Sequence, residues 1–175
     1  YGFILHAEYL EHQRDETLHP LKKCVDKLVE LATITEKECV WWHNYKEVKY
    51  NIPPPWASAM AQGEAISLFL RYYQIRGEEK YLDLSLKAFN FLKYHESNKQ
   101  VRRFDEKGCL WYEEYPSSPP SYVLNGFVYA LFGLYDLYRV TGMNSIKEEI
   151  DLCIDTLKKN LHRFDAGYWS YYDLQ

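Results

Sequence analysis

Carboxylate and phenol side chains, which can exchange protons with a bound molecule, gather in two aromatic-rich segments of the chain. Glu113, Glu114 and Tyr115 follow Trp111, and Tyr172 lies in a later run of aromatic residues. A buried glutamate can serve as a general base near neutral pH. A tyrosine, whose ordinary pKa is about 10, can serve as a proton donor. These residue types therefore suit the removal and return of a weakly acidic proton.

The same residues also have a structural explanation. Adjacent residues of a strand point to opposite faces, so one of Glu113 and Glu114 is expected to be solvated. A tyrosine such as Tyr115 or Tyr172 can pack at a rim with its hydroxyl hydrogen-bonded. Residue type alone therefore leaves proton-transfer and structural roles open.

The elements that would position these residues form an internal repeat. Gln62-Gly63 matches Asn125-Gly126, 63 residues further along, and each match lies in an apolar segment with helical periodicity that ends before a glycine. A second, amphipathic helix follows each of these segments. The repeat predicts three helical hairpins, with helices at 1–17 and 21–32, at 57–76 and 80–93, and at 121–140 and 146–161.

A short segment with high β-propensity follows each predicted hairpin. The three segments are residues 39–45, 109–115 and 168–172. In this register Asn44 and Tyr172 are equivalent to Glu114. If the segments reach the same end of the helices, these three side chains face a common cleft.

A regular repeat of helical hairpins predicts a helical array or a closed ring of hairpins. The expected fold class is all-α with short β-hairpins, in the form of an incomplete α/α toroid. The helices at 57–76 and 121–140 suit an inner ring because they are apolar over most of their circumference, and the equivalent Tyr72 and Tyr135 are expected to pack there. The helices at 80–93 and 146–161 carry Lys and Glu on one face and suit an outer ring.

Composition limits the class of protein. Of the 175 residues, 47% are hydrophobic and 26% are charged, which is typical of a globular domain and excludes a disordered chain. The net charge of −4 argues against a nucleic-acid-binding module. No apolar stretch of the sequence reaches the length of a membrane span. Residues 1–175 are expected to form a single domain that is a fragment of a longer chain.

Neither a metal ion nor a redox cofactor is expected. Cys24, Cys39, Cys109 and Cys153 form no CxxC pair, and the histidines lack the spacing of metal ligands. The cysteines are expected to be reduced residues of the core, with a disulfide as the alternative in a secreted protein.

Three segments together carry a resemblance to a known family. They are residues 55–63 (PWASAMAQG), residues 111–137 (WYEEYP, then PPSYVLNG and FVYALFGLYDL) and residues 171–174 (YYDL). In order and spacing, from about residue 50 to the end, they resemble the C-terminal catalytic domain of D-glucuronyl C5-epimerases.

The resemblance implies an α/α-toroid domain that inverts C5 of D-glucuronate to L-iduronate residues within a heparosan-like polysaccharide. The acid/base glutamate of the family corresponds to Glu114, and two of its active-site tyrosines correspond to Tyr115 and Tyr172. A third catalytic tyrosine of the family lies in a Trp-Asp-Tyr segment beyond Gln175. Animal members are Golgi enzymes, whereas a microbial member could be cytoplasmic or secreted, so the sequence leaves the compartment open.

This reaction sets requirements for the rest of the site. The C5 proton lies next to a carboxylate, whose charge must be neutralised by hydrogen bonds or cations before a carbanion can form. The predicted substrate-binding residues, which include basic residues of the short hairpin leading to Glu114, are Arg102, Arg103, Asn44, Gln62 and Trp111, with Lys99 nearby. Solvated charges, a helix cap at Gln62 and a hairpin core at Trp111 are the structural alternatives.

Two other functions fit the same sequence. A uronate polysaccharide lyase would remove the same proton and then expel the substituent at C4, and one fold can serve both reactions. A non-catalytic glycan-binding module is the third hypothesis, because the C-terminal tyrosine segment of the family is absent. The partners expected are an acidic polysaccharide and a second copy of the chain in a homo-oligomer, but no nucleic acid.

Overall fold

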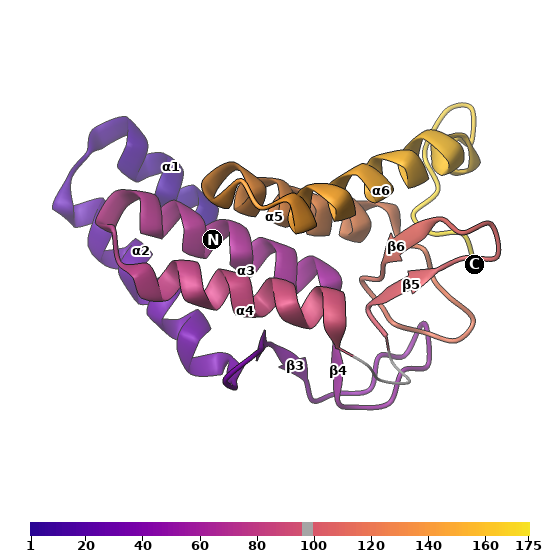
Figure 1. Cartoon of the computed structure of the whole chain (residues 1–175), viewed down its shortest axis with the longest axis horizontal. Coiled ribbons are helices and arrows are strands. Elements are labelled where there is room, and N and C mark those ends of the chain that lie inside the picture. Colours follow the sequence, from indigo (N-terminus) through magenta and orange to yellow (C-terminus); the bar gives the residue numbers. More distant parts are fainter. Residues whose placement is uncertain (96–99) are drawn as a thin grey trace.

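The computed structural model describes residues 1–95 and 100–175. Its helices form three hairpins that follow one another along the chain (Figure 1). The hairpins pair α1 (Gly2–His12) with α2 (Asp15–Leu31), α3 (Ala59–Arg76) with α4 (Glu79–Tyr94), and α5 (Leu124–Thr141) with α6 (Asn144–Asn160). The predicted fold class, helical hairpins with short strand pairs, is therefore confirmed.

The largest difference from the predicted boundaries occurs in α2. The sequence predicts a helix from residue 21, directly after Pro20, whereas α2 begins at Asp15 and continues through the proline. Asp15 and Glu16 lie in the first turn, where the helix dipole favours negative charge. Pro20 lies in the second turn and lacks the N–H that would bond to the carbonyl of Glu16, yet the helix continues through it.

Short antiparallel strand pairs lie around the hairpins. They are β1 (Thr33–Ile34) with β2 (Cys39–Val40), β3 (Trp42–His43) with β4 (Trp56–Ala57), and β5 (Arg102–Phe104) with β6 (Leu110–Tyr112). After α6 and a 3₁₀ helix (η1, Leu161–Phe164), the predicted strand segment at 168–172 forms only an isolated bridge between Asp165 and Ser170. That bridge closes a tight turn at Gly167, which has a φ of 84°, and residues 161–164 on its other side are in the 3₁₀ helix, so they form no strand.

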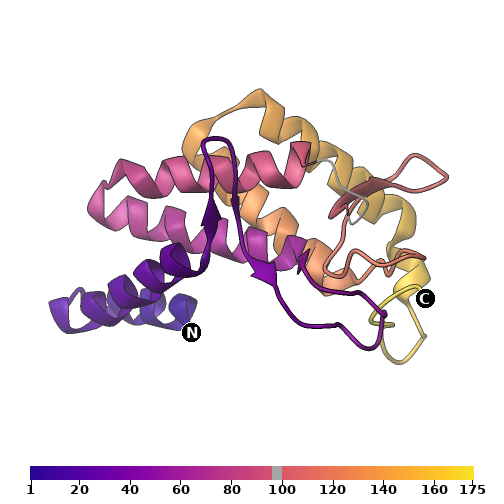
Figure 2. The same ribbon diagram turned by 90° about the horizontal axis from the view of Figure 1, so that it is seen from below.

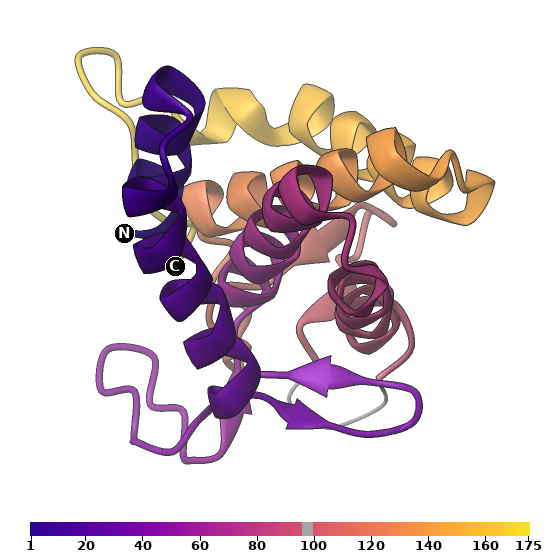
Figure 3. The ribbon, with the colours of Figure 1, turned by 90° about the vertical axis from the view of Figure 1, so that its left-hand side faces the viewer.

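The helix α3 lies between α1 and α5 and packs on both (Figure 3). It contacts α5 most extensively, because glycines let the two backbones approach. A Cβ atom at Gly133 would lie 2.5 Å from the Cα of Gly63, and one at Gly63 would lie 2.6 Å from the Cα of Ala130. Further along, Arg71 pairs with Asp136 at 2.5 Å. The two helices therefore run in the same direction and begin at the same end of the molecule.

Aromatic side chains fill the core between the hairpins. The largest fully buried ones include Trp56, Trp111, Tyr72, Tyr81, Tyr112, Phe69, Phe89, Phe91, Phe127 and Phe164. Tyr72 is thus buried as predicted, but its repeat equivalent Tyr135 is 50% exposed. Tyr135 shares its exposed face of α5 with Tyr129 and Phe132, so α5 is not packed all round within the described residues.

In residues 1–95 and 100–175, no helix combines the length and the apolar character that crossing a membrane requires. The four cysteines are free thiols, and three of them, Cys39, Cys109 and Cys153, are buried. Burial raises the pKa of Cys39 to about 12. Cys39 is therefore a protonated core side chain.

Adding one methyl group between α3 and α5 tests the glycine contact. In the variant Gly133→Ala, the new Cβ meets the backbone of Gly63, which cannot rotate away. We expect the free energy of unfolding to fall by about 1–3 kcal/mol or more in a urea titration. Asn125→Ala, at an exposed position of the same helix, should change it by less than about 0.5 kcal/mol. Equal stability of the two variants would contradict the close contact.

Candidate active site

Two backbone hydrogen bonds bring the segments that follow α4 and α6 to the starts of α3 and α5. The N–H of Ala59 donates to the carbonyl of Glu113 at 3.0 Å, and the N–H of Leu124 donates to the carbonyl of Tyr172 at 3.1 Å. Because α3 and α5 begin at the same end, the next residue, Glu114, meets Tyr172. The C-terminal segment lies at this end in two perpendicular views (Figures 1 and 2).

Glu114 and Tyr172, which are 58 residues apart in sequence, are in contact. The Tyr172 hydroxyl lies 3.4 Å from both carboxylate oxygens of Glu114. Glu114 is 8% exposed and Tyr172 is 46% exposed. A molecule in solution can therefore reach the tyrosine hydroxyl, and through it the carboxylate.

The neighbouring Glu113 points the other way and is structural. Its carboxylate accepts hydrogen bonds from the Ser121 hydroxyl at 2.8 Å and from the N–H of Tyr122 at 3.1 Å. The prediction that one glutamate of the pair is solvated is wrong, because both are buried. The two residues follow the end of β6 at Tyr112, and both side chains are covered by other parts of the chain.

Gly126 makes room for the Glu114 side chain at the first turn of α5. A Cβ atom at this position would lie 2.9 Å from the carboxyl carbon of Glu114 and nearer still to its Cβ and Oε2. The carboxylate therefore lies against the helix start, where the aligned peptide dipoles favour negative charge. Gly63, the equivalent glycine of the preceding hairpin, instead lies against the backbone of Ala130.

Tyr115 and Tyr50 join the site through ring contacts. The two ring centroids are 4.9 Å apart, and Trp56 lies 5.6 Å from Tyr115. The Tyr50 hydroxyl donates to Asp173 at 2.5 Å. These contacts fix the loop between β3 and β4 against the C-terminal segment.

Lys49 supplies a positive charge that the sequence did not single out. Its ammonium group bonds to Asp173 and lies 5.0 Å from the ring centroid of Tyr172, and its side chain is 59% exposed. Lys49 and Asp173 are 124 residues apart. The repeat gave no signal for Lys49, because it compares equivalent positions of the hairpins rather than contacts between them.

The surroundings shift the pKa values of the site in a consistent way. Burial raises the pKa of Glu114, and the charge of Glu64 raises it further, whereas hydrogen bonds with Tyr115 and Tyr172 lower it. Burial and then the charge of Glu114 raise the pKa values of Tyr115 and Tyr172. The charge of Lys49 acts in the opposite direction on Tyr172. The pKa values of Glu114, Tyr115 and Tyr172 therefore all lie above their ordinary values, and the two tyrosine hydroxyls stay protonated near neutral pH.

The predicted cation Arg102 is occupied by the protein itself. It donates to Glu149 through Nε at 2.8 Å and Nη2 at 3.0 Å, and the Tyr112 hydroxyl donates to the same carboxylate at 2.7 Å. Burial alone would raise the pKa of Glu149, but these hydrogen bonds hold it below its ordinary value. Arg102 therefore neutralises a buried acid and does not contact Glu114.

The other predicted cations are also away from Glu114. Arg103 is largely buried, and its Nε lies 3.7 Å from Oε1 of Glu113. Arg102 and Arg103 line a separate basic cavity with Lys93 and His95. The prediction at Lys99 lies outside the described residues.

Gln62 and Trp111 lie in the core. Gln62 is fully buried; its side chain accepts from the N–H of Trp41 at 3.1 Å and donates to the carbonyl of Cys39 at 2.9 Å. Trp111 is 1% exposed and donates to Asp105 at 3.1 Å. Both side chains therefore hold strands in place, and the hairpin-core alternative fits Trp111. Asn44 is exposed after β3 and takes no part in the Glu114 contacts described above.

Among residues 1–95 and 100–175, no three His, Cys, Asp or Glu side chains come together in a way that could hold a metal ion.

The fold is shared with carbohydrate-active enzymes built as α/α toroids. The structure of cellobiose 2-epimerase from Bacillus thermoamylovorans matches with a TM-score of 0.66 at 16% identity, over 95% of this chain and 44% of that one. A glycoside hydrolase family 76 mannosidase from Bacteroides thetaiotaomicron matches with a TM-score of 0.55 at 17% identity, over 94% and 42%. At these identities the likeness defines the fold alone.

The family is defined by sequence. The model of the D-glucuronyl C5-epimerase C-terminus matches residues 35–175, and the chain belongs to this family. It is 40% identical to D-glucuronyl C5-epimerase of Caenorhabditis elegans over 141 residues, which is 74% of this chain and 23% of that protein. It is also 31% identical to an uncharacterized protein of Methanocaldococcus jannaschii over 150 residues, 82% of this chain and 49% of that protein. The chain thus spans at most about half the length of these two relatives.

Two substitutions should move the pKa of Glu114 in opposite directions. Tyr172→Phe removes a hydrogen bond that stabilises the carboxylate, so the pKa should rise further. Glu64→Gln removes a nearby negative charge, so the pKa should fall. The pKa can be followed through the carboxyl ¹³C resonance of Glu114, whose wild-type midpoint should lie above the ordinary value of about 4.3. Glu106→Gln, at an exposed turn, is the control; shifts of one sign in both site variants would contradict this arrangement.

Proposed function

We propose that this chain carries the acid–base centre of an epimerase that converts D-glucuronate to L-iduronate residues within a heparosan-like polysaccharide. The observation that carries the proposal is the contact of buried Glu114 with the Tyr172 hydroxyl, beside Tyr115. Family membership and the name of the Caenorhabditis elegans relative support the same reaction.

The proposed reaction needs two proton-transfer groups. Ionised Glu114 removes the C5 proton, and the electron pair is delocalised into the adjacent carboxylate of the sugar. A tyrosine hydroxyl, from Tyr172 or Tyr115, returns a proton to C5 from the opposite face. Glu114 is then protonated and the tyrosine is ionised, so one proton must pass back between them. The 3.4 Å separation in the free site is short enough for that transfer after the product leaves.

The sugar enters by replacing a weak contact. At 3.4 Å, the Tyr172–Glu114 hydrogen bond is longer than a normal O–H···O bond. For C5 to lie between the two groups, the Tyr172 hydroxyl must move away from Glu114, which breaks this bond and replaces it with contacts to the sugar. Burial raises the pKa values of both groups, so Tyr172, whose ordinary pKa is already about 10, is the proton donor, and Glu114 is the group that ionises more readily.

Lys49 meets the requirement for a cation. As the carbanion forms, negative charge grows on the carboxylate of the sugar, and a nearby ammonium group lowers the energy of that state. Lys49 is held over Tyr172 by Asp173 and keeps much of its side chain in solvent. The pairing of Arg102 with Glu149 leaves Lys49 as the cation nearest to these tyrosines in the contacts described above.

Exchange of solvent hydrogen at C5 tests the reaction directly. The whole protein is incubated with N-sulfated heparosan in D₂O, and deuterium at C5 is followed by NMR. We expect exchange without chain cleavage, and a loss of about 10²-fold or more in rate for Glu114→Gln. Glu106→Gln is the matched control and should retain the wild-type rate.

Two outcomes would contradict this proposal. An unsaturated, ultraviolet-absorbing product with shorter chains would identify a lyase. Binding of the polysaccharide without any deuterium incorporation would identify a non-catalytic glycan-binding module.

Replacing Lys49 tests the electrostatic step separately. Lys49→Met should lower kcat/KM about tenfold or more, because a charged hydrogen bond to the sugar is lost. Lys49→Arg should restore most of it. Lys46→Met, an exposed lysine of the same loop, is the matched control. Equal kcat/KM values for Lys49→Met and Lys46→Met would contradict an electrostatic role for Lys49.

A further inference from the structure

A basic cavity of about 360 Å³ is formed by the end of α4 and by β5. Its lining includes the side chains of Lys93, His95, Arg102 and Arg103, and no acid is among the described residues that line it. The chain as a whole carries a net charge of −4, so this concentration of basic groups is local. The volume falls within the range of small-molecule binding pockets.

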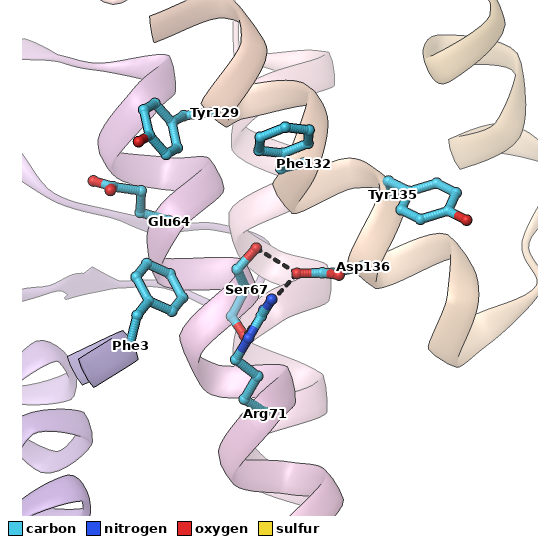
Figure 4. A pocket seen from close by; sticks show the side chains of 8 residues that line it. All are labelled: Phe3, Glu64, Ser67, Arg71, Tyr129, Phe132, Tyr135 and Asp136. Atoms are coloured by element: carbon cyan, nitrogen blue, oxygen red, sulfur yellow. Dashed lines mark hydrogen bonds and ion pairs between the residues drawn. The ribbon is translucent and has the colours of Figure 1, made fainter. Parts of the chain in front are cut away.

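Another arginine-containing cavity of the molecule provides a comparison. It has a volume of about 430 Å³, lies between α1, α3 and α5, and is lined by Arg71 together with two acids, Glu64 and Asp136. Figure 4 shows that Ser67 and Arg71 both donate to Asp136, at 2.7 Å and 2.5 Å. In that cavity the arginine is compensated by an acid of the same lining, which leaves little attraction for an anion.

The acids that compensate the basic cavity are instead buried behind its cations. Arg102 donates to Glu149 through two nitrogens, and Nζ of Lys93 lies 3.5 Å from the same carboxylate, which is 3% exposed. The Nε atom of Arg103 lies 3.7 Å from the carboxylate of Glu113, which is 0% exposed. An anion that enters this cavity therefore meets cations before it meets either carboxylate.

Positive charge exceeds negative charge in this cluster. Arg102 compensates Glu149, so Lys93 and Arg103 share only Glu113, and burial raises the pKa of Glu113, which disfavours its charged form. Lys93 lies in the last turn of α4, where the helix dipole favours a cation, but this explanation does not apply to the arginines of β5. The excess charge suits a ligand that carries two negative charges.

Arg103 has hydrogen-bonding capacity that the protein does not use. Among the described residues, its Nε atom has no hydrogen-bond partner, and neither has Oε1 of Glu113, which it faces. Its Nη2 atom donates to the carbonyl of Gln100 over 3.4 Å, which is long for such a bond. Buried donors without partners are unfavourable, and the planar fork of a guanidinium matches two oxygens of a tetrahedral anion.

Two exposed aromatic rings border the cations. The Cζ atom of Arg102 lies 4.9 Å from the ring centroid of Phe104, and Nζ of Lys93 lies 5.5 Å from that of Tyr94. Both rings line the cavity, and they are 50% and 60% exposed. A tetrahedral anion alone fills only a small part of the cavity, so a larger group attached to the anion can lie against the rings.

We propose that this cavity binds a sulfate or phosphate monoester, with the tetrahedral anion on Arg103 and Lys93 and the rest of the molecule against Tyr94 and Phe104. A carboxylate fits less well, because it brings only one negative charge. No lining residue takes part in the Glu114 contacts described above, so the inference concerns a separate site and does not rest on the proposed function.

Titration with inorganic sulfate and inorganic phosphate tests the anion contacts. The whole protein is titrated with each ion at constant ionic strength, maintained with chloride, and Kd is measured from amide shifts by NMR. We expect Arg103→Gln to raise Kd about tenfold, because a charged hydrogen bond is lost, and Lys93→Gln to raise it in the same direction. Arg102 is left unchanged, because its loss would leave the buried Glu149 without its ion pair.

Lys107→Gln is the matched control, because it removes the same charge from the exposed turn between β5 and β6. It should retain the wild-type Kd. Arg103→Lys keeps the charge without the fork and should bind more tightly than Arg103→Gln, and thermal unfolding should show that all variants remain folded. No saturable binding of either ion, or equal Kd values for Arg103→Gln and Lys107→Gln, would overturn the proposal.

Phenyl sulfate and phenyl phosphate test the ring contacts and separate the two kinds of ligand. Each ester should bind more tightly than its free ion, and Phe104→Ala should remove that gain. The ester that binds more tightly identifies a sulfated or a phosphorylated ligand. Esters that bind no more tightly than the free ions would overturn the placement against the rings. Because no probe contains a uronate, these results are independent of deuterium exchange at C5.

Discussion

The close approach of α3 and α5 at Gly63 and Gly133 is the constraint on which the rest of the structure depends. Two helices with side chains at both positions could not come as near, because backbone atoms would collide with each added Cβ. The contacts at Gly63 with Gly133 and at Arg71 with Asp136 follow the same order along both helices, so the helices are parallel and start at one end. The two backbone bonds at those starts then fix where Glu114 and Tyr172 lie. The positions of Glu114 and Tyr172 are therefore determined by helix packing rather than by local loop structure.

Burial and charge act on this frame to give chemically different groups. Glu114 loses solvent and faces Glu64, so its neutral form is favoured, while the tyrosine hydroxyls and the start of α5 stabilise the charged form. The net effect is a pKa of Glu114 above its ordinary value. Glu149 is also buried, and its charged form is stabilised by the ion pair with Arg102. A cation that compensates a core acid is not available to a ligand.

Most of the fold could be predicted from the periodicity of the sequence. Apolar spacing and terminal glycines predicted the three hairpins, and the family resemblance gave Glu114, Tyr115 and Tyr172, which the structure brings together. Long-range contacts could not be predicted from the sequence. Lys49 bonds to Asp173, which is 124 residues away, and no pattern in either segment indicates this pair. Residue type also misled at Gln62 and Trp111, because polar and aromatic side chains serve strand–helix contacts as readily as ligands. The exposed face at Tyr135 could not be read from periodicity, since exposure depends on which helices are neighbours.

The repeat offers a view of how such a site can arise. Gly63 and Gly126 occupy equivalent positions of two successive hairpins, yet the first admits a neighbouring helix and the second admits the side chain of Glu114. Both uses need only the absence of a side chain. A duplicated hairpin therefore has space beside its helix start, where the glycine lacks a side chain, before any group occupies that space. Once one copy holds the helices together, the other is free to acquire a reactive group without loss of the scaffold.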